Sequence, residues 1–307
     1  MNFRACMTSN SPILMEGALG ERLKREYGLD INGNVAMADL IYNEKGRMAL
    51  KTLWREYISI AHKYSLPFMA TTPTRRANKE RVVKSGYDET IILDNVEFLR
   101  RIKEASDLEM YMGGLMGCKG DAYTGADALG TEEAHDFHYW QAQLFKKGKV
   151  DFLYAGIMPV LAEAAGMAKA MSDTDIPYII SFTIQRDGKL IDGHTINYAI
   201  RLIDDNVPHK PVCYMTNCVH PCIVCEALLQ EFNQTETVRT RFIGIQANTS
   251  ALSYSQLDGS CDLKYSSPLD LAESMMKLKS EYNFRIFGGC CGTDSRHMEE
   301  IAKMLIV

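Results

Sequence analysis

Short apolar stretches alternate with longer amphipathic stretches along the whole chain. The short stretches are rich in β-branched and aromatic residues, which is typical of buried strands. The longer ones, such as "LAEAAGMAKAM" and "DLAESMMKLKSEY", have the three-to-four-residue spacing of apolar positions that predicts helices. The predicted strands occupy residues 12–16, 66–72, 110–115, 150–156, 177–183, 211–217, 241–248 and 284–289.

Repeated strand–helix units of this kind favour a parallel sheet. Eight units are what a closed (β/α)8 TIM-type barrel requires, and such a barrel carries its active-site groups at the C-terminal ends of the strands. An open doubly wound sheet is the alternative. Because no Pro- or Ser-rich linker and no low-complexity tract divides the chain, we predict one (β/α)8 domain over residues 1–307.

Composition narrows the class of partner. The formal net charge of −5 offers no basic field for nucleic acid or an anionic membrane. The sequence has no apolar run long enough to span a bilayer, and "MNFRACMTSN" lacks the apolar core of a signal peptide. We therefore predict a cytoplasmic protein that acts on small molecules. Nine cysteines without a secretion signal favour reduced thiols over a disulfide framework.

The stretch "GGCCGT", residues 288–293, places two neighbouring cysteines among glycines. Adjacent side chains on a strand point to opposite faces, so Cys290 and Cys291 can face one site only where the backbone leaves strand geometry, as glycine permits. Cys218 follows the predicted sixth strand, which lies near the eighth in a barrel. Three thiolates with one open position form an open zinc site. The spacing therefore predicts Zn²⁺ bound by Cys218, Cys290 and Cys291.

Three motifs carry a resemblance along essentially the whole chain: "EGALG" from Glu16, "NC" at 217–218 followed by a proline, and "GGCCGT". Together they resemble the homocysteine S-methyltransferase family, whose members use betaine, S-methylmethionine or folate as methyl donor. The resemblance implies a (β/α)8 barrel, zinc on the cysteines matching Cys218, Cys290 and Cys291, and methylation of homocysteine to methionine. Zinc deprotonates a bound thiol that remains a nucleophile, so no protein acid or base is expected.

The methyl donor is less closely defined. Three cysteinates and a substrate thiolate would leave a zinc centre with a formal charge of −2 (+2 − 4), which favours a cationic donor. We expect S-methylmethionine or S-adenosylmethionine ahead of betaine. The chain shows no G-x-G-x-x-G nucleotide fingerprint and leaves no room for appended folate or cobalamin domains. A partner corrinoid protein remains an alternative source of the methyl group.

The resemblance also implies substrate contacts. Glu16 and Gly17 stand where the family commonly has Asp-Gly, and the Glu16 carboxylate could hold a substrate ammonium group. Thr72 lies in "TTPT", which replaces a common Thr-Asn-Thr. Asn248 matches an asparagine of the seventh-strand loop, where a turn role is as consistent as substrate contact.

One position departs from the family. Many relatives have Phe-Glu-Thr-Ile-Pro after the fourth strand, with the glutamate holding the amino group of homocysteine, whereas this chain reads "AGIMP" at 155–159. Gly156 takes the place of that glutamate. This departure leaves the zinc chemistry intact and favours, as an alternative, a thiol acceptor other than homocysteine.

Two other functions compete with this interpretation. Cys218, Cys222 and Cys225 in "CVHPCIVC" have the C-x3-C-x2-C spacing of radical S-adenosylmethionine enzymes, which bind a [4Fe–4S] cluster. That assignment leaves the pair at 290–291 without a role, and core thiols of a helix explain Cys222 and Cys225 better. The other alternative is a barrel that binds zinc or a thiol without catalysing transfer.

Overall fold

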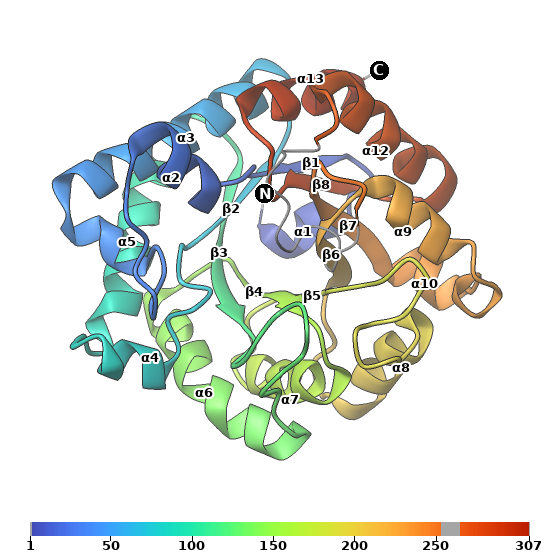
Figure 1. Ribbon diagram of the computed structural model, residues 1–307, viewed down its shortest axis with the longest axis horizontal. Coiled ribbons are helices and arrows are strands. Elements are labelled where there is room, and N and C mark those ends of the chain that lie inside the picture. Colours follow the sequence, from blue (N-terminus) through green and yellow to red (C-terminus); the bar gives the residue numbers. More distant parts are fainter. Residues whose placement is uncertain (1, 253–264, 307) are drawn as a thin grey trace.

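The computed structural model describes residues 2–252 and 265–306, which form a closed barrel of eight parallel strands (Figure 1). Each strand pairs with the next, and β8 pairs with β1, for example Phe287 with Leu14. The predicted (β/α)8 barrel is confirmed, and the closed sheet excludes the doubly wound alternative. The strands are β1 (Ile13–Met15), β2 (Phe68–Thr71), β3 (Met110–Gly117), β4 (Phe152–Met158), β5 (Tyr178–Phe182), β6 (Cys213–Val219), β7 (Phe242–Ala247) and β8 (Ile286–Gly289).

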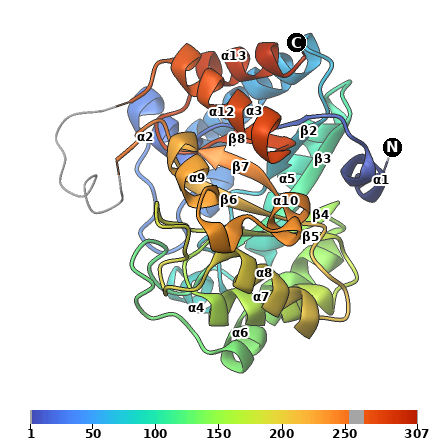
Figure 2. The same ribbon diagram turned by 90° about the vertical axis from the view of Figure 1, so that its right-hand side faces the viewer.

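Helices surround the strands as an outer ring, and α13 packs between α12 and α3, which joins the two ends of the ring (Figure 1, Figure 2). None of the described helices is long and apolar enough to cross a membrane. The helices are α1 (Phe3–Thr8), α2 (Gly20–Tyr27), η1 (Ala38–Tyr42), α3 (Glu44–Lys63), α4 (Lys79–Lys84), α5 (Thr90–Glu104), α6 (Thr131–Gly148), α7 (Leu161–Ser172), α8 (Ile196–Asn206), α9 (Pro221–Leu228), η2 (Glu231–Asn233), α10 (Glu236–Arg241), α12 (Pro268–Tyr282) and α13 (Ser295–Leu305).

The strands are buried on both faces, so the core has two layers. The inner layer fills the barrel with alternate side chains of the strands, among them Met15, Phe152 and Met215. The outer layer lies between the strands and the helices. Burial of an apolar side chain of this size contributes roughly 1.5–3 kcal/mol. A parallel sheet covered on both faces explains why the strands read as continuous apolar runs.

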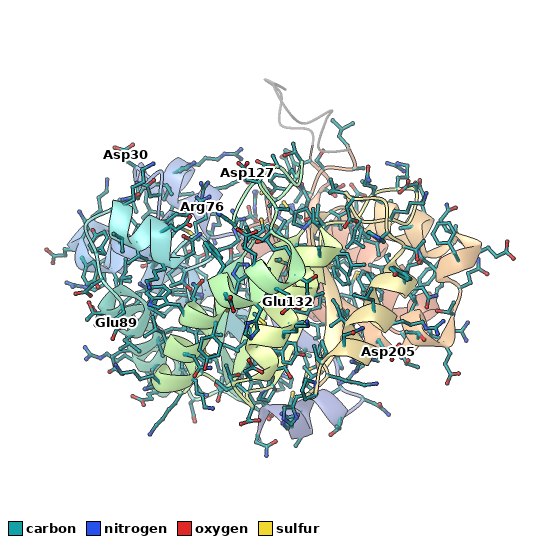
Figure 3. All side chains as sticks on the ribbon, turned by 90° about the horizontal axis from the view of Figure 1, so that it is seen from below. Asp30, Arg76, Glu89, Asp127, Glu132 and Asp205 are labelled. Atoms are coloured by element: carbon teal, nitrogen blue, oxygen red, sulfur yellow. The ribbon has the colours of Figure 1, made fainter. Side chains whose placement is uncertain are left out.

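Helix α1 closes the N-terminal end of the barrel. The Phe3 ring stacks on Phe152 with 4.5 Å between centroids and meets Tyr111 edge-on at 5.4 Å. The Asn2 side chain caps the helix by accepting from the Ala5 N–H, and the Arg285 side chain donates to the carbonyl of Met7. Figure 3 shows α1 at one end of the barrel and the labelled Arg76 and Asp127 at the other. The opposite, C-terminal end is the mouth.

Two strands have a bulge near the mouth. Ile157 in β4 and Cys218 in β6 have positive φ angles, 58° and 57°, and the pairing register shifts at both places. A bulge re-aims the side chains around it. The Ile157 N–H donates to Oδ1 of Asn217 at 3.1 Å, so the two bulges support each other. Cys218 thus lies inside the bulged end of β6, one residue earlier than its end, rather than after the strand.

Candidate metal centre

The structure brings the three predicted cysteines together at the mouth. The sulfurs of Cys218, Cys290 and Cys291 all lie within 4.8 Å of one another, and those of Cys218 and Cys291 are 3.3 Å apart. Among the described residues this is the one cluster of three metal-ligating side chains found. Cys222 and Cys225 on α9 do not belong to it, so the C-x3-C-x2-C cysteines do not converge.

The fate of those two helical cysteines differs. Cys225 is partly buried and packs against the outer core layer, as expected. Cys222 is exposed, and its sulfur contacts Oγ of Ser274 at 3.8 Å, so the interpretation of Cys222 as a core thiol is wrong. The first turn of α9 places it on the outer side of the helix.

A tight turn after β8 presents the cysteine pair. The Cys290 N–H donates to Ala247 O at 2.7 Å, which continues the ladder with β7, and the Thr293 N–H and hydroxyl both donate back to Cys290 O. Gly292 has a φ of 82°, and a Cβ there would lie 2.0 Å from Thr249 Oγ1. A Cβ on Gly289 would lie 2.2 Å from Thr293 Oγ1. The glycines therefore allow the turn to form and to pack.

Ionisation of the metal-free cluster is unequal. The pKa of Cys218 is well below its usual value because the thiols of Cys290 and Cys291 donate to its sulfur, against the effect of burial. The pKa of Cys290 and that of Cys291 are well above the usual value, first because each donates to Cys218 and then because of burial. The hydrogen bonds of the cluster thus favour the thiolate form of Cys218 over that of Cys290 or Cys291.

Two neutral groups also face the sulfur of Cys218. The Tyr123 hydroxyl donates to it at 3.4 Å, and Nδ2 of Asn248 lies 3.7 Å away. Oδ1 of Asn248 accepts from the Ser250 N–H at 2.9 Å, so this residue, predicted as a turn or substrate contact, supports both a turn and the cluster. Sequence reasoning missed Tyr123, which lies 95 residues before Cys218 in a loop.

That loop, residues 118–130 between β3 and α6, is held at several points. Oδ1 of Asp121 accepts from the Tyr123 N–H at 2.9 Å, and the Thr183 hydroxyl donates to Ala122 O at 3.0 Å. The fully buried Glu163 carboxylate on α7 accepts from the backbone N–H groups near both ends of the loop, those of Lys119 and Leu129. Tyr123 is therefore fixed against the cluster by the fold.

Below the cluster lies a polar layer that we call the polar floor: Tyr154, Asn217 and Gln246. The Tyr154 hydroxyl donates to Oε1 of Gln246 at 3.0 Å, and Nδ2 of Asn217 donates to the Tyr154 oxygen at 2.9 Å. All three side chains are buried. Sequence reasoning missed them, although the two-residue alternation that points Phe152 inward would also have pointed Tyr154 inward.

Glu16 lies at the end of β1 and is buried. Oε1 accepts from the Thr71 N–H at 3.0 Å and the Thr71 hydroxyl at 2.6 Å, while Oε2 accepts from Nε1 of Trp54 at 2.6 Å. Burial raises the pKa of Glu16 to about 7, because desolvation outweighs these three hydrogen bonds. The carboxyl group is thus held in place and can change charge near neutral pH.

Gly17 and Thr72 have structural contacts. A Cβ on Gly17 would lie 2.8 Å from the Tyr57 ring, whose hydroxyl donates to Ala18 O. The Thr72 hydroxyl is fully buried, accepts from the Leu115 N–H at 3.1 Å and lies 2.7 Å from the Thr74 hydroxyl. Their roles in substrate binding stay predictions.

Gly156 leaves a gap that a neighbour fills. A Cβ on Gly156 would lie 2.9 Å from Cδ1 of Leu115, 3.6 Å from Cε1 of Tyr154 and 3.8 Å from Met116 O. The position therefore adjoins the polar floor, inside the barrel. The tip of Leu115 occupies the space that a longer side chain would take.

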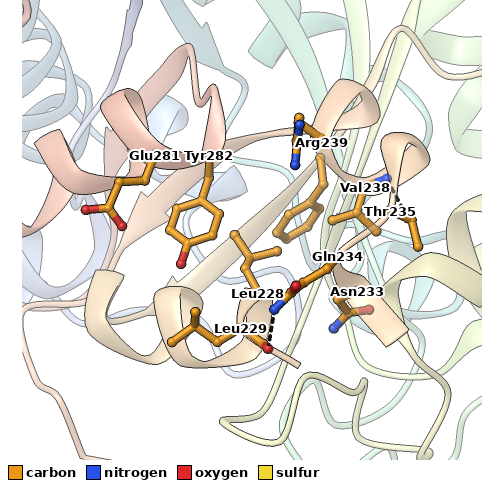
Figure 4. Close-up of a pocket in the computed structure, with 10 residues that line it drawn as sticks. Leu228, Leu229, Asn233, Gln234, Thr235, Val238, Arg239, Glu281 and Tyr282 are labelled. Atoms are coloured by element: carbon orange, nitrogen blue, oxygen red, sulfur yellow. Dashed lines mark hydrogen bonds between the residues drawn. The ribbon is translucent and has the colours of Figure 1, made fainter. Parts of the chain in front are cut away.

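A separate cavity of about 250 Å³ lies outside the barrel, between α9, α10 and α12 (Figure 4). Leu228, Arg239 and Tyr282 line it, and Figure 4 shows the Gln234 amide bonded to Leu229 O. It contains neither the cysteine cluster nor any predicted substrate contact. The chemistry of this molecule therefore centres on the mouth.

A (β/α)8 barrel with three cysteine sulfurs converging at its mouth defines a barrel enzyme equipped to bind a soft metal ion beside a substrate. The model of a protein family, homocysteine S-methyltransferase, matches residues 13–305. The chain belongs to the homocysteine S-methyltransferase family and is an S-methyltransferase.

Solved structures agree on the fold. The metallated form of the homocysteine methyltransferase MmuM from Escherichia coli is 18% identical, with a TM-score of 0.75 over 98% of this chain and 99% of that one. Its oxidised form is 17% identical, with a TM-score of 0.75 over 97% of each chain. A search of curated proteins found no match.

Proposed function

We propose that this protein is a zinc-dependent methyltransferase that moves a methyl group from a small cationic donor to a thiol. The observation that carries the proposal is the cluster of Cys218, Cys290 and Cys291. A set of three thiolates with one open position suits Zn²⁺, whereas Mg²⁺ and Ca²⁺ prefer oxygen ligands. The residues present therefore fit the metal that the family implies.

The bound metal would supply a substrate thiolate that is deprotonated yet nucleophilic at neutral pH. The chain's own groups hold the cluster. Tyr123 and Asn248 orient the sulfur of Cys218 through hydrogen bonds, and the glycine turn aims Cys290 and Cys291 at it. No protein acid or base is required, so the remaining task of the site is to align the sulfur, the methyl carbon and the leaving group.

The donor follows from charge. A thiolate-rich centre at the mouth attracts a sulfonium or ammonium methyl group, so we favour S-methylmethionine or S-adenosylmethionine ahead of betaine. A corrinoid partner protein is the second candidate source, since the described chain is filled by one barrel.

Homocysteine is the acceptor that the family description implies, and Glu16 is the anchor we propose for its ammonium group. Oε1 of Glu16 already accepts two hydrogen bonds and Oε2 one, so Oε2 has capacity for a further donor. Gly156 offers no carboxylate, and Leu115 fills its place. We therefore propose that a thiol without a free α-amino group serves at least as well.

Metal analysis and a substrate panel test the proposal. We expect about one Zn²⁺ per chain and turnover with thiols plus a cationic methyl donor, both lost in Cys290→Ser. The matched control is Cys222→Ser on the surface of α9, which should keep both. If wild type instead contains iron and labile sulfide, and Cys222→Ser loses both, the protein is a radical S-adenosylmethionine enzyme and the zinc proposal is wrong. If the protein binds stoichiometric zinc but turns over no combination of thiol and methyl donor, the alternative of a non-catalytic zinc-binding barrel is supported.

A further inference from the structure

A cavity of about 500 Å³ lies beside the metal centre and is lined by basic side chains. We call it the basic cavity and define it by Arg75, Arg76, Arg81 and Lys119, which come from the segment after β2 and from the loop after β3. Arg76 stands at the mouth end of the barrel, away from α1 (Figure 3). The cavity therefore opens on the same side as the cysteine cluster.

Two arginines of the basic cavity lack an ion-pair partner among the described residues, although the charge of Asp121 acts on Arg76 from nearby. Nε of Arg76 is buried and has no hydrogen-bond partner, and in the described part of the chain neither Arg75 nor Arg76 forms an ion pair. Burial lowers the pKa of Arg76, and the positive charges of Arg81 and Arg75 lower it further. Crowding of unpaired guanidinium groups costs free energy unless an anion joins them.

Three acidic residues also line the basic cavity, and their hydrogen-bond and ion-pair partners among the described residues are groups other than Arg75 and Arg76. Oδ1 of Asp121 accepts from the N–H groups of Tyr123 and Thr124 and from the Thr124 hydroxyl. Glu80 lies 3.8 Å from the Lys119 ammonium in an exposed pair. Asp127 is exposed. None of the three meets Arg75 or Arg76 in a hydrogen bond or ion pair within the described residues.

The arginines are held in position. A Cβ on Gly117 would lie 2.6 Å from Cγ of Arg75, so only glycine at this point of β3 leaves room for that side chain. The Arg81 guanidinium donates to Lys119 O at 2.9 Å, and its backbone N–H donates to the Asn78 cap of α4 at 3.0 Å. The basic cavity is thus part of the fold.

Tyr123 connects the basic cavity to the metal centre. Tyr123 is one of the residues that line the cavity, and its hydroxyl lies 3.4 Å from the sulfur of Cys218. A ligand in the cavity is therefore separated from the sulfurs by one tyrosine side chain.

We propose that the basic cavity binds the anionic group, a carboxylate or a sulfonate, of the thiol whose sulfur lies at the metal centre. This inference rests on the proposed function. The planar guanidinium groups of Arg75 and Arg76 match the two oxygens of a carboxylate. The methyl donors favoured above also carry a carboxylate, so the acceptor is assigned on position: Tyr123 both lines the cavity and contacts the sulfur of Cys218, where the thiol would be held. Recognition through the acid end compensates for the missing carboxylate at Gly156.

Two probes that differ only in charge test this assignment without a methyl donor. 4-Mercaptobutyrate and its uncharged amide, 4-mercaptobutyramide, are titrated calorimetrically into the zinc-loaded protein. We expect wild type to bind the acid about tenfold to hundredfold more tightly, as a charge-assisted hydrogen bond provides. Arg76→Gln should abolish this preference and leave the affinity for the amide unchanged, and Arg76→Lys should restore part of it. Arg47→Gln, an exposed arginine on α3, is the matched control.

The outcomes separate this inference from the proposed function. An undiminished preference in Arg76→Gln, or equal weakening of both probes, overturns the assignment. If the protein holds no zinc and binds neither thiol, the proposed function fails, and butyrate titrated into the metal-free protein then tests the cavity by itself. Saturable binding of butyrate by wild type and not by Arg76→Gln supports the anion site, and absence of binding by wild type refutes it.

Discussion

Glu16 and Gly156 show how single residues change the fit of the mouth to its substrate. The Glu16 carboxyl is buried with three hydrogen bonds and a pKa of about 7, so it is partly neutral at the pH where an ammonium group would need its charge. Gly156 supplies nothing in its place. If Glu16 anchors the ammonium group as proposed, binding of an α-amino group at this mouth depends on one titrating carboxyl.

The first prediction at this scale concerns pH. Because the folded pKa of Glu16 is raised to about 7, the charged form that can pair with an ammonium group appears as the pH rises through 7. The ratio of kcat/KM for homocysteine to that for 4-mercaptobutyrate should rise about tenfold between pH 6 and pH 8, since kcat/KM reports the free enzyme. Ionisation of the thiol affects both acceptors, so its effect largely cancels in the ratio of the two kcat/KM values. A flat ratio in wild type, or the same rise in Glu16→Gln, would contradict this role.

The raised pKa of Glu16 also makes the free energy of unfolding depend on pH. The unfolded carboxyl titrates near 4.5, so the neutral form favours the folded state at low pH, and this contribution is lost as the pH rises through about 7. Glu16→Gln should therefore flatten the dependence of the free energy of unfolding on pH between these two values. Urea denaturation at pH 5 and pH 8 measures the difference.

A second prediction concerns Gly156→Glu. The added carboxylate should improve homocysteine relative to 4-mercaptobutyrate by about tenfold to hundredfold, the value of a charge-assisted hydrogen bond. Leu115→Ala in the same chain makes room for it, because the Leu115 tip lies 2.9 Å from the new Cβ. Gly156→Ala is the control without charge. If wild type already prefers homocysteine a hundredfold and the glutamate adds nothing, the amino group is held elsewhere.

At the scale of elements, two strand ends and one turn assemble the cluster. The bulge in β6 gives Cys218 a φ of 57°, and the turn after β8 depends on Gly292 at a φ of 82°. Both are departures from regular strand geometry. The departure at Cys218 costs roughly 1–2 kcal/mol, since the left-handed region disfavours residues with a Cβ, whereas Gly292 avoids this cost.

The turn yields a paired prediction. Gly86→Ala, at a φ of 75° with nothing within 4 Å, should cost only the strain of that backbone, about 1 kcal/mol, and leave metal binding intact. Gly292→Ala has the same kind of φ, but its Cβ would lie 2.0 Å from Thr249 Oγ1. It should cost more stability and weaken zinc binding in competition with a chelator. Equal effects of the two substitutions would show that the turn does not set the metal site.

The eight strands could be read from the sequence because each is a short apolar run flanked by helical periodicity. The convergence of Cys218 with Cys290 could be predicted because both lie at the C-terminal ends of β6 and β8, which only β7 separates in the barrel. The contribution of Tyr123 could not, since nothing local marks which residue of a 13-residue loop meets a sulfur 95 positions later. Exposure of Cys222 was missed for a similar reason: helical spacing locates a residue on a helix, whereas burial depends on what packs against it.

At the scale of the whole molecule, we expect a bound metal to protect the cysteine cluster from oxidation. Cys218 is the thiol whose pKa the cluster lowers, and its sulfur lies 3.3 Å from that of Cys291, in contact but without an S–S bond. We expect metal-free protein to lose activity in air and to recover it with reductant plus zinc, because bare thiolates oxidise. Zinc-loaded protein should resist. Activity and the number of titratable thiols measure the loss in air. Equal losses from the metal-free and the zinc-loaded protein would contradict protection of the cluster by the metal.

Side chains such as Phe152 fill the barrel, and helix α1 covers its N-terminal end through Phe3, so substrates have access to the cluster from the mouth. Whatever enters at the mouth must leave by the mouth, so acceptor and donor share one route with both products. A thioether still anchored at its acid end would hold that route closed to the next acceptor while the demethylated donor is free to diffuse away. Release of products through this single opening would then limit turnover, and the product bound more tightly by the arginines would leave last.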